Sequence, residues 1–157
     1  MAGVKTNTLP ITQNIKTFQG QLTAAQTNVG ATMAGSPGTL NAAAGPSGFY
    51  TAGNNDAVIK SLLIASDDTS ARVVNVYIYN GTNFACLGGV NVPITAGLTG
   101  AIANVDVLGT SFLLGLELDQ AGKPVLPLTS GNQLCLASQT TLTAAKTLSV
   151  FGVAEEF

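Results

Sequence analysis

The residues best suited to chemistry are a few carboxylates in an otherwise almost uncharged chain. Asp67 and Asp68 are adjacent, and with backbone carbonyls they could bind Ca²⁺. Their spacing lacks the alternating oxygen ligands of a calcium loop, so a solvated turn is the simpler interpretation. Asp106, Glu117 and Asp119 could supply the carboxyl pair that glycoside cleavage needs. No aromatic sugar platform accompanies them, which favours ordinary surface or turn carboxylates.

The other residue types that support catalysis are scarce. Histidine is absent, which excludes Ser-His-Asp and Cys-His arrangements and most zinc sites. The Gly88-Gly89 pair has neither the spacing nor the lysine of a phosphate-binding loop. Cys86 and Cys135 each lie in an apolar strand pattern, so we interpret them as buried free thiols, with a disulfide between facing strands as the alternative. We therefore predict a protein that is not an enzyme and holds no cofactor or metal.

The low charge restricts the partners. Charged residues are 9% of the chain, against roughly 25% in an average soluble domain. Such a surface either meets other protein over much of its area or is the neutral polar surface of a monomer. The net charge of −2, without a basic cluster, disfavours nucleic acid. No apolar run approaches the ~20 residues of a membrane span, and no signal-peptide pattern opens the chain, so we expect synthesis in a cytoplasm.

The N-terminal third differs from the rest. It is rich in Thr, Ala, Gly, Asn and Gln, and turn sequences interrupt it at residues 35–38 and 45–48. So little apolar surface cannot fold alone. We therefore predict an extended N-terminal arm over residues 1–48, which runs across another protein chain, and a body over residues 49–157. The predicted partner-binding anchors are its bulky apolar residues: Leu9, Ile11, Ile15, Phe18 and Leu22.

The body has the pattern of an antiparallel sheet protein. From Arg72 to Tyr79 the residues alternate, with Val74, Val76 and Ile78 on the face predicted to be buried. Asn80-Gly81 follows and predicts a two-residue hairpin turn. Further strand-length segments are separated by turn signals to the end of the chain. The fold class predicted is all-β: an antiparallel β-sandwich, jelly-roll-like with about eight strands.

Two smaller features of the body allow alternatives. Tyr77 and Tyr79 share the other face of that strand, where they could contact a partner or simply pack within the sheet. Arg72 follows the Asp67-Asp68 turn and could pair with either carboxylate. If exposed, such a pair would contribute only about 0–1 kcal/mol.

Five motifs of the body occur in a familiar order. They are Ser66-Asp-Asp-Thr-Ser-Ala-Arg72, Tyr79-Asn-Gly81, Val92-Pro93, Asp119-Gln-Ala-Gly-Lys-Pro-Val125-Leu-Pro-Leu128 and Leu142-Thr-Ala-Ala-Lys-Thr-Leu-Ser-Val150. Over roughly residues 50–157 the chain resembles small virion proteins of tailed bacteriophages, of the kind that decorate or cement the head.

The resemblance implies a β-sandwich on the surface of the capsid, made in the host cytoplasm and often trimeric at local three-fold points. Its partners would be the major capsid protein and copies of itself, and the family has no catalytic residues to transfer. Two other roles fit the same composition. A tail, fibre or head-to-tail connector component would be present in far fewer copies per particle. A carbohydrate-binding module would need aromatic side chains on which a sugar can stack, and the chain has no Trp.

Overall fold

The computed structural model describes residues 14–23, 47–109 and 113–157. Within these ranges the chain forms ten strands and no helix, so the all-β prediction is confirmed, and no helix there could cross a membrane. The strands are β1 (Asn14–Leu22), β2 (Ser47–Thr51), β3 (Ala57–Ser66), β4 (Arg72–Tyr79), β5 (Phe84–Val92), β6 (Val105–Asp106), β7 (Glu117–Leu118), β8 (Pro124–Leu128), β9 (Gln133–Ser138) and β10 (Leu148–Glu156).

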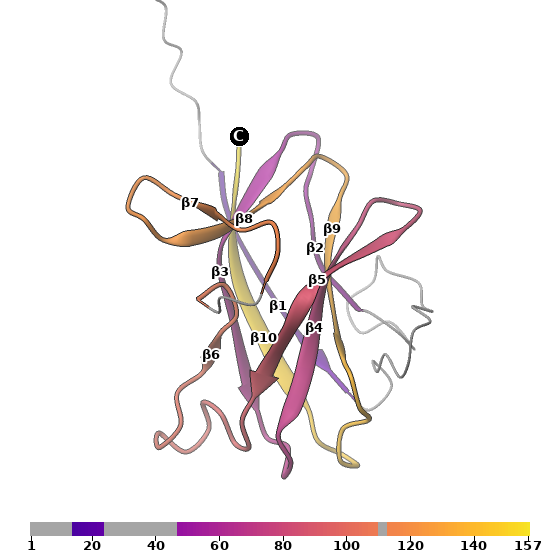
Figure 1. The fold of residues 1–157 in the computed structure, drawn as a ribbon, viewed down its shortest axis with the longest axis vertical. Coiled ribbons are helices and arrows are strands. Elements are labelled where there is room, and N and C mark those ends of the chain that lie inside the picture. Colours follow the sequence, from indigo (N-terminus) through magenta and orange to yellow (C-terminus); the bar gives the residue numbers. More distant parts are fainter. Residues whose placement is uncertain (1–13, 24–46, 110–112) are drawn as a thin grey trace, which may run out of the picture.

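The strands form two antiparallel sheets (Figure 1). The larger sheet has the order β1-β10-β3-β8-β7, and β6 pairs with β3 beside this path. The smaller has the order β2-β9-β4-β5. The connections through which the chain crosses between sheets after β3, β5 and β9 lie at the lower end of Figure 1: residues 67–71, 93–104 and 139–147. We call these three segments the loop end.

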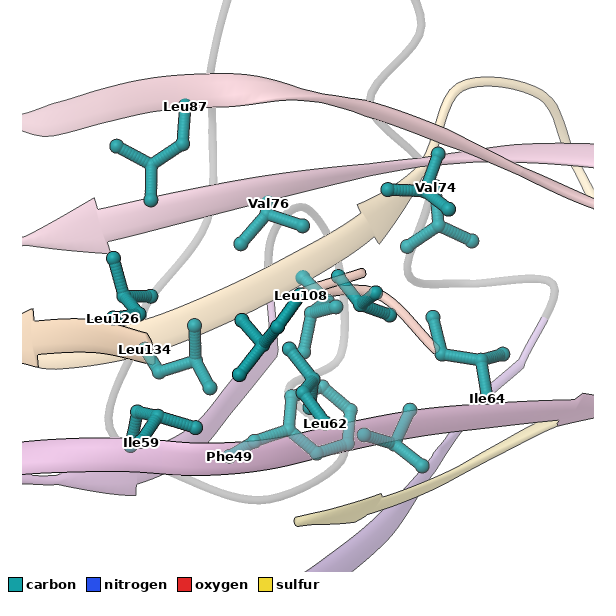
Figure 2. Close-up of a cluster of buried hydrophobic side chains, with 14 of the residues drawn as sticks. Phe49, Ile59, Leu62, Ile64, Val74, Val76, Leu87, Leu108, Leu126 and Leu134 are labelled. Carbon is teal, nitrogen blue, oxygen red and sulfur yellow. The ribbon is translucent and has the colours of Figure 1, made fainter. Parts of the chain in front are cut away.

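The core lies between the two sheets. Alternate residues of the strands point inward, and in β3 a bulge at Lys60 shifts the alternation by one residue. β3 therefore contributes Ile59, Leu62 and Ile64, which lie opposite side chains of the smaller sheet in Figure 2. Val74 and Val76 are fully buried, which confirms the predicted inward face of β4, although Ile78 on the same face is only partly buried. Burial of each such side chain stabilises the fold by about 1.5–3 kcal/mol.

The hairpin predicted at Asn80-Gly81 is present, but its loop has four residues, not two. Tyr79 pairs with Phe84, and residues 80–83 form the turn. Gly81 has the expected positive φ, at 89°. The Asn80 N–H still donates to the Asn83 carbonyl at 3.2 Å, and the Asn80 Oδ1 accepts hydrogen bonds from the backbone N–H of Thr82 and Asn83 at 3.0 and 2.8 Å. These side-chain bonds stabilise a wider turn than the Asn-Gly pair alone requires.

The predicted boundary between arm and body does not match the structure. Residues 14–22 are not a separate arm but strand β1, which pairs with β10 of the same chain over its whole length. Phe18 and Leu22 point into the core, with 8% and 0% of their surface exposed. The residue types of this segment allow a strand, but the sequence does not show that its partner is β10 of the same chain. Two inward residues are enough for an edge strand whose backbone is already paired on one side.

The cysteines do not form a disulfide. Both lie opposite Tyr77, Cys86 on β5 and Cys135 on β9. Two strand spacings of about 4.8 Å separate them, which is beyond the Cα separation that a disulfide spans. Cys135 is buried, as predicted, and burial raises its pKa to about 12, whereas Cys86 is exposed and the prediction of burial was wrong there.

Candidate functional site

The β5–β6 connection exposes large apolar side chains at one end of the molecule. Ile94, Leu98 and Ile102 are 45%, 58% and 36% exposed, and the whole segment 93–104 carries no charge. We call these three residues the loop tip. Exposed apolar side chains are common singly, but three of them on one uncharged segment are typical of a contact surface.

The loop that carries the tip is held in one conformation by its backbone. The N–H of Gly97 donates to the carbonyl of Ile102 at 2.8 Å, and the N–H of Ser66 donates to Ala96 at 2.9 Å. Gly97 has a φ of 77°, and any side chain there would clash with the carboxamide of Asn104. A loop fixed in this way loses little conformational entropy when it binds.

A buried ion pair closes the β3–β4 turn behind the loop tip. The Arg72 Nε donates to Asp68 Oδ2 at 2.8 Å, and the Asp68 side chain is fully buried. The Thr143 hydroxyl and the Ser70 N–H donate to Asp68 Oδ1 at 2.6 and 3.0 Å. Burial alone would raise the pKa of Asp68, but these hydrogen bonds outweigh it and hold that pKa well below its usual range. The pair is therefore not the weak, exposed contact that the sequence suggested.

Thr143 belongs to the β9–β10 loop, so the pair ties two segments of the loop end together. Asp67 adds a second tie, because its Oδ1 accepts a hydrogen bond from the Thr147 N–H at 2.5 Å. Both carboxylates of the Asp67-Asp68 pair thus accept hydrogen bonds from the protein itself, but Asp68 is buried, so the turn is not the solvated one that the sequence predicted. Within the described ranges no three His, Cys, Asp or Glu side chains come together to hold a metal ion.

The remaining carboxylates considered for glycoside cleavage also belong to turns. Asp106 accepts a hydrogen bond from the Gly109 N–H at 3.2 Å. Asp119 accepts from the N–H groups of Ala121 and Lys123, both at 2.9 Å, and its pKa is lowered mainly by the bond from Lys123. Glu117 is exposed on β7. These contacts match the interpretation of Asp106 and Asp119 as turn carboxylates.

A second surface lies on the outer face of the larger sheet, where β1, β10 and β3 enclose a hollow of about 580 Å³. Phe151 lies on this face and is 42% exposed, with Gln19 of β1 on one side and Leu63 of β3 on the other. The lining carries no charge. We call it the neutral hollow, and its residues are Gln19, Gly20, Gln21, Leu63, Ala65, Asn104, Ser149, Val150 and Phe151.

Of the predicted anchors, only Ile15 lies on the surface among the described residues, where it is 69% exposed on β1. Phe18 and Leu22 belong to the protein's own core and cannot anchor the chain on a neighbour. Leu9 and Ile11 lie outside the described residues.

Sequence reasoning missed the loop tip and Phe151. The spacing of four between Ile94, Leu98 and Ile102, without strand alternation, was the available signal for the tip. The alternation of β10 would have placed the Phe151 side chain on the outer face of the sheet, because its neighbour Val150 points inward.

No family model, curated protein or solved structure matches the chain. The loop tip and the neutral hollow are the two surfaces of the described residues that bear on function.

Proposed function

We propose that this chain is a non-enzymatic structural protein of a tailed-bacteriophage virion, which decorates and cements the assembled head. The loop tip is the observation that carries the proposal. It presents three exposed apolar side chains on an uncharged loop that is already fixed in conformation. A surface of this kind suits docking onto another protein, since apolar burial drives association and little ordering is needed.

We further propose that the fold is a jelly roll. The strand order supports this: β1, β10, β3 and β8 lie in one sheet, and β2, β9, β4 and β5 lie in the other. Successive strands cross from one set of four to the other, except at the hairpin between β4 and β5, in the way that a rolled-up pair of Greek keys requires. On this interpretation the two-residue strands β6 and β7 are additions to an eight-stranded body.

A protein with this role stabilises the shell by mass action. It binds the major capsid protein only where subunits are assembled, so its binding free energy favours the assembled state over the free subunits. The same low charge that limits self-repulsion permits close contact with further copies of this chain. A trimer at local three-fold points is the arrangement that the resemblance implies.

The test is binding to particles. Purified protein is added to assembled heads that lack it, bound protein is recovered by gradient sedimentation, and copies per particle are counted. Hundreds of copies are expected for a head decoration protein. A few dozen or fewer would favour the tail, fibre or connector role, and no binding to heads or tails would overturn the proposal.

The neutral hollow supports a second candidate, carbohydrate binding. Phe151 offers an exposed ring, and Gln19, Gln21 and Ser149 beside it offer amide and hydroxyl groups suited to a neutral sugar. Glycan-array binding that is lost in Phe151→Ala would support this function. An array without signal for the wild-type protein would eliminate it.

A further inference from the structure

We infer that strand β1 pairs antiparallel with β1 of a second copy of this chain, so that two larger sheets join across a two-fold axis. The outer edge of β1 pairs with no other described strand. Alternate residues of an edge strand direct their N–H and C=O groups outward, and a long edge of this kind is a template for another strand. The inference does not depend on the virion role.

The other sheet edges in the described part of the chain are protected, and β1 is not. Edge strand β7 has two residues. Edge strand β2 has five residues and a bulge at Phe49, and edge strand β5 has a bulge at Leu87 next to Gly88. Short strands and bulges are the usual protection against edge pairing. β1 instead has nine residues in unbroken register with β10, and Lys16 is its only charge.

The sequence of β1 is compatible with pairing to itself. A two-fold axis perpendicular to the sheet centres a full overlap on Phe18, so Thr17 lies opposite Gln19 of the second copy. Lys16 then lies opposite Gly20, and the two lysines are about 13 Å apart along the strands. Phe18 lies opposite Phe18 of the second copy, and no pair in this register brings like charges together.

The same register brings a residue of one copy to the site of the other. Ile15 lies opposite Gln21 of the second copy, and Gln21 lines the neutral hollow. Ile15 is exposed to 69% in a single chain, on the same outer face of the sheet as the hollow. In the pair, Ile15 of each copy extends the wall of the other copy's hollow beyond β1, so the hollow is complete only in the dimer.

The first test is the mass of the free protein in solution, measured by light scattering across the micromolar range. Wild-type protein is expected at twice the 15.8 kDa chain mass. Thr17→Lys with Gln19→Lys places lysine opposite lysine twice and should raise the dissociation constant about tenfold or more. Thr17→Lys with Gln19→Glu places lysine opposite glutamate and should preserve the dimer.

Thr82→Lys with Gln120→Lys is the matched control, because it adds the same charge at exposed positions away from β1. It should remain dimeric. A wild-type monomer, a three-chain mass that the β1 lysines leave unchanged, or equal dimerisation of all variants would overturn the inference.

A second test reads the register. In a Cys86→Ser background, a mixture of Thr17→Cys and Gln19→Cys proteins should cross-link on oxidation faster than either protein alone, because those two positions face each other. Cross-linking of Thr17→Cys alone at the same rate would contradict the two-fold register.

Discussion

The Asp68 carboxylate is the single group on which the loop end depends most. It is fully buried and binds Arg72, Ser70 and Thr143 from three positions in the chain. Asp68→Asn keeps the size but leaves the Arg72 guanidinium, which is 12% exposed, without its counter-charge. We expect this change to lower the free energy of unfolding at pH 7 by about 2–4 kcal/mol. Urea titrations measure this change. In them Asp106→Asn, at an exposed position, should keep the free energy of unfolding within about 0.5 kcal/mol of the wild-type value.

The difference in free energy of unfolding between wild type and Asp68→Asn should depend on pH with a definite sign. Hydrogen bonds lower the pKa of Asp68 in the folded protein, so its contribution is fully present above the unfolded pKa, near 3.9. The contribution is lost as the pH falls from there toward the folded pKa. The stability gap between wild type and Asp68→Asn, measured from pH 7 to pH 2, should therefore be constant down to about pH 4 and narrow below it. A stability difference that persists unchanged to pH 2 would show that the charge of Asp68 does not cause the loss of stability in Asp68→Asn.

The two thiols should react very differently with a maleimide. Cys86 is exposed on the edge strand β5, whereas Cys135 is buried and its pKa is raised by burial to about 12. Mass spectrometry should find one labelled thiol per chain in native protein at pH 7.5 and two in urea. Cys86→Ser should abolish native labelling, and rapid labelling of both thiols in native wild type would contradict the burial of Cys135.

At the scale of elements, the contact that fixes β1 in the sheet is between Phe18 and Gly152 of β10. The two residues pair across the ladder, and the Phe18 ring occupies the space where a side chain of residue 152 would lie. Gly152→Ala should displace the ring and lower the free energy of unfolding by about 1–3 kcal/mol. Ser149→Ala, at an exposed position of the same strand, is the control. Faster hydrogen exchange of residues 14–22 in Gly152→Ala would show that β1 is the element released.

The elements that could be read from sequence are those whose signals are local. Alternation placed Val74 and Val76 inward, and Asn80-Gly81 marked the hairpin. The elements that could not are set by distant partners. The residues of β1 allow a strand, but its place beside β10 is set by a distant segment, which puts a glycine opposite Phe18. The hydrogen bond from the Tyr50 hydroxyl to Glu156, 2.6 Å long, likewise joins residues 106 positions apart.

The candidate site was hidden for a similar reason. The apolar residues of the loop tip are visible in the sequence, but their exposure is not, because a Gly-rich segment could equally fold them inward. The loop conformation that exposes them is held by the backbone hydrogen bonds of Gly97 and Ser66, and no local sequence pattern predicts those bonds. For the predicted anchors on β1, Ile15, Phe18 and Leu22, the sequence did not show which of them face the core and which face outward.

For the whole molecule, the proposed virion role predicts that one end of the sandwich contacts the particle. The loop end and the end that carries β7 lie at opposite ends of the ribbon in Figure 1. Ile94→Lys with Leu98→Lys places two charges on the loop tip without touching the core, since both residues are exposed. If the tip docks onto the shell, each lysine must lose its water in an apolar contact, so occupancy on heads should fall by about tenfold or more.

The control is Leu114→Lys with Leu118→Lys, which makes the same change at residues 69% and 71% exposed outside the loop end. Both double variants should unfold at the same urea concentration as wild type, so that a loss of binding cannot be a loss of fold. Loss of occupancy in the loop-tip variant alone supports docking through the loop end. Loss in the control alone would place the docking surface at the β7 hairpin instead. Equal occupancy for all three proteins would mean that neither apolar surface contacts the particle, and the proposal would lose the observation that carries it.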